Sequence, residues 1–227
     1  MSNIFKNLDW SILTGAVFSI IPALICITFH ELSHGFVAYK LGDPTAKQMG
    51  RLTLNPLKHI DIIGLVMMIV FRFGWAKPVP VNMRYFKKPK RYMAVTALAG
   101  PVSNLLLAVV FIFIYGFLYT LLTGNGNAST ATIGINILEM INRTAYISIA
   151  LAVFNLVPIP PLDGSKVLFS FIPDKAYNQL MRYERFGMIL LIVFISTNAF
   201  NATVGKATSY IFGKLMSIAL FSYKLVN

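Results

Sequence analysis

The sequence has few charged residues and very few acidic ones. Only 12% of its 227 residues are charged, and only 8 are Asp or Glu. A soluble globular chain carries about 25% charged and about 45–50% apolar residues. Here 56% of the residues are hydrophobic and the mean hydropathy is +0.68. The composition excludes an ordinary soluble enzyme and indicates a lipid bilayer as the main partner and solvent.

Cysteine and histidine are scarce as well. Cys26 is the single cysteine, so the chain can form neither an internal disulfide nor a cysteine-based zinc cluster. We interpret it as a small apolar residue inside a helix. The sequence has only 3 histidines, which leaves few positions for a histidine-based metal site.

The net charge is +12, and most of the basic residues are concentrated in two segments. Eleven of the 20 Lys and Arg residues fall between Lys40 and Arg91, and four more lie between Lys166 and Arg185. Basic loops between apolar runs are typical of the cytoplasmic side of membrane proteins. No basic-aromatic motif for nucleic acid is present, so we expect no nucleic-acid partner.

Long apolar runs predict an all-α polytopic membrane protein with about five to six transmembrane or re-entrant helices. A helix of about 20 apolar residues crosses the hydrocarbon core. One run is too short to span, and we interpret it as re-entrant. The expected segments are Trp10–Phe29 continuing to Leu41, the short run Ile62–Phe73, Tyr92–Leu122, Ile141–Val157, Phe186–Phe200 and Ala207–Phe221.

The segments between these runs complete the expected organisation. The polar stretch Thr45–Asp61 predicts a small extended or β region on the cytoplasmic side, and Gly74–Arg91 predicts an irregular loop. We find no internal repeat or linker, so residues 1–227 are expected to form a single domain. Its core spans residues 10–165, and additional membrane helices cover about 186–224.

Loop charge also predicts the orientation. The two basic segments are expected in the cytoplasm and the uncharged loop Thr123–Thr132 outside. The first and third spans then both end at the cytoplasmic face. We therefore expect a multi-pass protein of the cell (inner) membrane whose active site opens towards the cytoplasm.

One motif carries recognisable chemistry: His30-Glu31-Leu32-Ser33-His34. Residues four apart share one face of a helix, so both imidazoles can reach one ion. Zinc suits imidazole and takes three protein ligands plus a water in catalytic sites. Glu31 lies beside the metal and can act as a general base.

A third ligand must come from elsewhere, and Asp163 is the best placed of the 8 acidic residues. The predicted topology brings it to the same membrane face as the histidines. The alternative is an aspartate that serves only the turn before Gly164.

The chain resembles the site-2 protease family of intramembrane zinc metalloproteases. We find no inserted PDZ-like or nucleotide-sensing CBS domain, so it looks like a compact bacterial-type member. Four stretches carry the resemblance: Phe29–Gly35; Gly50–Pro56 with His59-Ile60-Asp61; Ala99–Asn104; and Asn155–Gly164.

The resemblance implies one Zn²⁺ per chain held by His30, His34 and Asp163, with Glu31 as general base for the zinc-activated water. It implies hydrolysis of peptide bonds in or next to transmembrane segments, as in regulated intramembrane proteolysis. The substrate would be a membrane-anchored protein or a leftover signal peptide. Asn155 would stabilise the tetrahedral oxyanion, or else make a polar contact in helix packing.

Several roles stay open at this point. His59 either contacts the site or serves a loop hydrogen bond, and Gly100, Pro101 and Asn104 are expected to allow close helix packing. The rival functions are a proteolytically silent membrane zinc-binding scaffold and a metal transporter. Glu31 argues against the scaffold, because a structural site needs no base. A metal transporter would need polar groups in the middle of several spans, yet the span Phe186–Phe200 offers only Ser196, Thr197 and Asn198.

Overall fold

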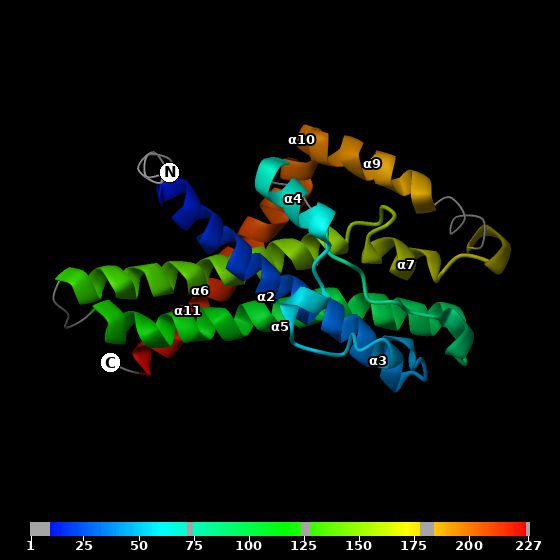
Figure 1. Ribbon diagram of the computed structural model, residues 1–227, viewed down its shortest axis with the longest axis horizontal. Helices are drawn as coiled ribbons and strands as arrows, with labels where there is room; N and C mark the ends of the chain where they lie inside the picture. Colours follow the sequence, from blue (N-terminus) through cyan, green and yellow to red (C-terminus); the bar gives the residue numbers. More distant parts are fainter. Residues whose placement is uncertain (1–9, 72–74, 124–127, 178–183, 226–227) are drawn as a thin grey trace, which may run out of the picture.

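The computed structural model describes residues 10–71, 75–123, 128–177 and 184–225, and these are mostly helical. Three long helices form the frame: α2 (Trp10–Lys40), α5 (Pro89–Thr123) and α6 (Ala128–Asn155). Each contains a segment long and apolar enough to cross a membrane. In Figure 1 α5 and α6 run alongside one another, and α2 crosses them.

The end of α2 follows from its sequence. Gly42 has a φ of 107°, a left-handed conformation that glycine adopts without cost. The N–H of Gly42 donates to Tyr39 O at 3.1 Å, and that of Asp43 donates to Ala38 O at 2.9 Å. This pair of bonds is a Schellman motif, which satisfies the last carbonyls of the helix. It confirms the predicted helix end.

Short elements fill the region between α2 and α5. They are the helices α3 (Thr45–Gln48) and α4 (Ile62–Phe71) and the 3₁₀ turns η1 (Pro56–Lys58) and η2 (Met83–Tyr85). The expected β region is not confirmed: within the described ranges only one isolated antiparallel bridge forms, between Ile60 and Ala76. Asn55 caps η1 by accepting from Leu57 N at 3.0 Å. The pair Asn55-Pro56 thus starts a turn here rather than a strand.

The chain after α6 turns back through α7 (Asp163–Phe169) and then forms α9 (Glu184–Ser196), α10 (Asn198–Phe200), a π-helical turn η3 (Asn201–Gly205) and α11 (Lys206–Lys224). The axis bends by 81° between residues 186–196 and 198–224. The bent pair counts as one broken span or as a re-entrant loop, so the described residues hold 3 spans, or up to 4. The expected five to six spans are therefore not confirmed.

An apolar core lies where α5, α6 and α11 meet. Ala108 and Ile112 on α5 pack with Ala145 and Ile149 on α6 and with Ala219 on α11. Many large apolar side chains elsewhere are exposed, among them Val110, Phe117 and Ile189. An outward-facing apolar surface of this kind suits contact with lipid. Cys26 is fully buried.

Candidate metal centre

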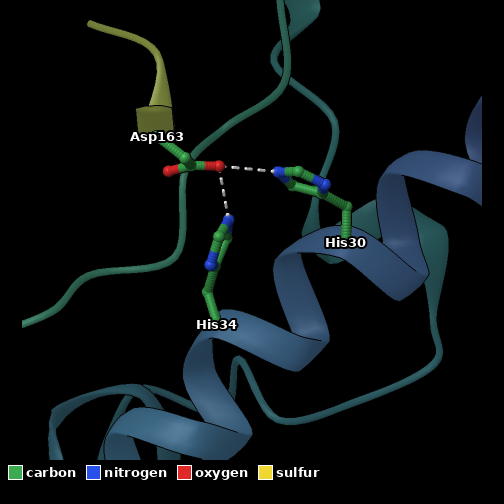
Figure 2. Close-up of side chains that lie close together, drawn as sticks. All are labelled: His30, His34 and Asp163. Carbon is green, nitrogen blue, oxygen red and sulfur yellow. Dashed lines mark hydrogen bonds and ion pairs between the residues drawn. The ribbon is translucent and has the colours of Figure 1, made fainter. Parts of the chain in front are cut away.

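Two histidines and an aspartate meet at the centre of the molecule. His30 and His34 project from one face of α2, and Asp163 is the first residue of α7 (Figure 2). The Nε2 atom of His30 lies 3.1 Å from Asp163 Oδ2, and that of His34 lies 3.0 Å from the same oxygen. The sequence-predicted convergence of these three side chains is therefore what the structure shows.

All three side chains are buried, with exposed fractions of 4%, 8% and 7% for His30, His34 and Asp163. The two rings meet edge to face at 88°, with centroids 4.6 Å apart. One potential ligand atom from each residue lies within 4.8 Å of the other two. This group can hold one metal ion, and two imidazoles with one carboxylate suit zinc.

Asp163 also has a positively charged neighbour. Lys166, one helical turn along α7, lies with Nζ 3.7 Å from Asp163 Oδ1. Burial opposes ionisation of this carboxyl, but His34, His30 and Lys166 outweigh it and hold its pKa below the usual range. The side chain is thus an anion at neutral pH, which is the form that binds a metal.

The neighbouring helix α5 leaves room for an ion beside the imidazoles. A Cβ atom placed on Gly100 would lie 2.5 Å from His34 Nε2 and 2.6 Å from His30 Nε2. Any side chain at this position would fill the space in front of the potential ligand atoms. The space and the donor set both fit a bound zinc ion.

Glu31 is held beside the three converging residues. The backbone N–H of Val79 donates to Glu31 Oε2 at 2.7 Å. Val79 belongs to the extended segment 75–82, which Arg51 fixes by donating to Lys77 O at 2.7 Å. Asp43, fully buried, accepts from Asn82 N at 2.6 Å. These contacts hold the segment against the C-terminal half of α2.

A cavity of about 390 Å³ opens onto these residues. His30, His34, Asp163 and Glu31 line it together with Asn155, and the other lining residues are mostly apolar. The amide of Asn155 donates to Leu151 O at 2.9 Å in its own helix. Asn155 therefore lies on the wall of the cavity and bonds within its own helix.

His59 does not belong to this cavity. Its side chain is 1% exposed, and its Nε2 lies 2.9 Å from Thr53 O. Of the two roles left open by the sequence, the structure shows the loop hydrogen bond.

The sequence interpretation missed two contacts of α5 with the histidines. The side-chain Nδ2 of Asn104 lies 3.3 Å from His30 Nδ1, and His34 Nδ1 lies 2.8 Å from Thr96 O. Gly100 and Asn104 were expected to serve helix packing, yet both face the histidines. Their spacing of four, which places them on one helix face, was the available signal.

A membrane-embedded helical frame with a buried His-His-Asp group defines a class: membrane proteins with a zinc-type metal centre. The chain belongs to peptidase family M50, the site-2 protease family, whose sequence model matches residues 18–197. Members of this family are membrane proteins, in agreement with the apolar helices.

Three relatives carry the name "Putative zinc metalloprotease" followed by YwhC, MJ0611 or Rip2. YwhC of Bacillus subtilis (strain 168) is 40% identical over 78% of this chain and 80% of its own length. MJ0611 of Methanocaldococcus jannaschii is 33% identical over 73% of this chain and 75% of its own. Rip2 of Mycolicibacterium smegmatis is 29% identical over 78% of this chain and 66% of its own. No solved structure matches significantly.

Proposed function

We propose that this chain is an intramembrane zinc metalloprotease, with His30, His34 and Asp163 as the zinc ligands. The observation that supports this most is the convergence of both Nε2 atoms on one buried carboxylate oxygen. Membership of a zinc metalloprotease family supports the choice of metal. A zinc ion held there would supply Lewis acidity, which makes water nucleophilic near neutral pH.

Glu31 is the general base in this proposal. It lines the same cavity as the three proposed ligands, and Val79 anchors its Oε2 atom. We assign Oε1 to proton transfer: it accepts a proton from the attacking water and returns it to the leaving amine. Asn155, on the wall of the same cavity, donates its amide to the oxygen that becomes negative.

The proposed substrate is the transmembrane segment of a membrane-anchored protein or a leftover signal peptide. The centre is formed by α2 and the first residue of α7, and α2 packs against two other candidate spans, α5 and α6. Exposed apolar side chains cover the frame. A substrate that reaches the cavity from the bilayer must therefore be apolar, and its helix must unwind, because a helical amide is protected by its own hydrogen bonds.

The test is cleavage of a model transmembrane substrate by the purified protein in detergent. Glu31→Gln keeps the shape of the side chain but removes its basicity. We expect it to bind zinc like the wild type and to cleave about 10²–10⁴-fold more slowly. A soluble peptide with the same scissile sequence is the matched control and should be cleaved poorly.

A different outcome would favour the silent zinc-binding scaffold. If wild type and Glu31→Gln both bind zinc and neither cleaves any substrate, the protease proposal fails. Equal cleavage by both would instead remove Glu31 as the base.

We also propose that the protein lies in the cell membrane with its active site open to the cytoplasm. The basic residues between Lys40 and Arg91 adjoin the end of α2 that carries the histidines. The test uses a Cys26→Ala background with one new cysteine at the exposed position Lys47. An impermeant maleimide should label it in inverted vesicles and not in intact cells. Labelling in intact cells would reverse the orientation.

A further inference from the structure

Asn104 is a buried polar residue with an unusual hydrogen-bonding pattern. Its side chain has no exposed surface, and its Nδ2 lies 3.3 Å from Nδ1 of His30. Its Oδ1 is buried and has no hydrogen-bond partner within the described part of the chain. Ser148 on α6 donates to the backbone oxygen of Asn104 at 2.8 Å, and not to its side-chain amide. An unpaired buried oxygen beside a proposed metal ligand calls for a physical reason.

The contact between Asn104 and His30 bears on the tautomer of His30. If Nδ2 donates to His30 Nδ1, that nitrogen carries the lone pair and Nε2 carries the proton. Such an imidazole cannot offer Nε2 to a metal. A half-turn of the Asn104 amide exchanges its oxygen and nitrogen with no change of shape. Oδ1 then accepts from Nδ1–H, and the Nε2 lone pair faces Asp163.

The second histidine already shows this arrangement. His34 Nδ1 lies 2.8 Å from the backbone oxygen of Thr96, which can only accept. His34 must therefore carry a proton on Nδ1, which leaves Nε2 as the nitrogen that can bind a metal. Thr96 and Asn104 both belong to α5, on either side of Gly100. One helix thus contacts the far nitrogens of both imidazoles.

We propose that Asn104 is a positioning residue of the metal centre: its side-chain oxygen accepts from Nδ1–H of His30 and so presents Nε2 to the zinc. The proposal rests on the metal centre of the proposed function but not on proteolysis. Partners of this kind fix the ring and its tautomer, and their removal costs about 10–100-fold in metal affinity.

The experiment measures the zinc dissociation constant of the full chain in detergent by competition with a chromophoric chelator. Asn104→Leu removes the acceptor and puts a larger apolar side chain in its place, whereas Asn104→Asp keeps the shape and an acceptor and removes the amide donor. We expect Asn104→Leu to bind zinc about 10–100-fold more weakly and Asn104→Asp to stay close to wild type. A role in packing alone predicts the opposite order for Asp and Ala, because Asp buries a charge whereas Ala leaves only a small cavity.

Two further variants complete the comparison. Asn104→Ala repeats the loss of the acceptor without filling the space, in case the leucine variant does not fold. Ser148→Ala removes the hydrogen bond from α6 to the same residue and should leave zinc affinity unchanged.

Equal weakening by Asp and by Leu or Ala, or wild-type affinity in Asn104→Leu, would overturn the proposal. A wild-type protein that binds no zinc would overturn the metal centre itself, and the two failures are therefore distinguishable.

Discussion

The two halves of α5 make contacts of opposite kinds. Its first half meets α2 through polar groups, where Thr96 O and the Asn104 side chain contact the two histidines. Its second half meets α6 and α11 through Ala108 and Ile112, which are buried among apolar residues. One continuous helix thus serves the proposed site at one end and the packing of the bundle at the other.

The difference shows where function and stability are separated. Buried polar groups in the first half contribute through specific geometry, and their replacement should change metal affinity more than folding. Buried apolar groups in the second half contribute through close packing, because lipid offers no hydrophobic driving force between helices. Substitutions in the first half should therefore lower zinc affinity more than stability, and substitutions in the second half should lower stability more than zinc affinity.

The largest effect is expected for Gly100→Ala in the first half. The added Cβ would lie 2.5 Å from His34 Nε2, in the space of the proposed ion. We expect zinc affinity to fall at least about 100-fold, which is more than the loss of a hydrogen-bond partner of a ligand usually costs.

The control is Gly213→Ala on α11, where a Cβ would meet nothing within 4 Å. This variant should bind zinc normally and be slightly more stable, since alanine is the better helix former by about 0.5–1 kcal/mol. Normal zinc binding by Gly100→Ala would show that the ion lies elsewhere.

Zinc removal should have the next largest effect, and within α5 it should depend on the first half and not on the second. Because zinc binds the folded site, a free concentration 100 times the dissociation constant stabilises the protein by about 2.7 kcal/mol. We expect a strong chelator to lower the thermal midpoint, and added zinc to restore it. Gly100→Ala should show no such shift. A shift of wild-type size in this variant would show that zinc stabilises the protein from a site other than the His-His-Asp group.

The smallest effect is expected for Ile112→Ala in the second half. Ile112 is 1% exposed at the junction of α5, α6 and α11. We expect a loss of about 2 kcal/mol in stability, at the low end for a large-to-small change, because the transfer contribution is small in lipid. Zinc affinity and cleavage at low temperature should match wild type. A loss of zinc in this variant would show that packing in the second half of α5 also determines zinc binding.

Much of this arrangement could be predicted from local sequence. The spacing of His30 and His34 places both on one face of α2, and Gly42 ends that helix as expected. Asp163 was found by topology, because two spans that run in the same direction bring their ends to one face. Local periodicity and loop charge favour these positions, and the family resemblance adds the role of Asp163 as a ligand.

The remaining features depend on contacts between distant segments. Val79 reaches Glu31 across 48 positions, and Asn104 reaches His30 across 74. No local pattern encodes such a pairing, because an extended segment such as 75–82 acquires its path only from its partners. The bend between α9 and α11 was missed for the same reason, since apolar composition does not say where a helix turns.

The zinc content of Asp163→Ala tests the central claim most directly. It should be measured beside Asp174→Ala, which removes a carboxylate that is 82% exposed and paired with Lys90. We predict one zinc per chain in wild type and in Asp174→Ala, and loss of zinc from Asp163→Ala after dialysis. One tightly bound zinc per chain in Asp163→Ala would contradict the account, because the third ligand would then be another residue.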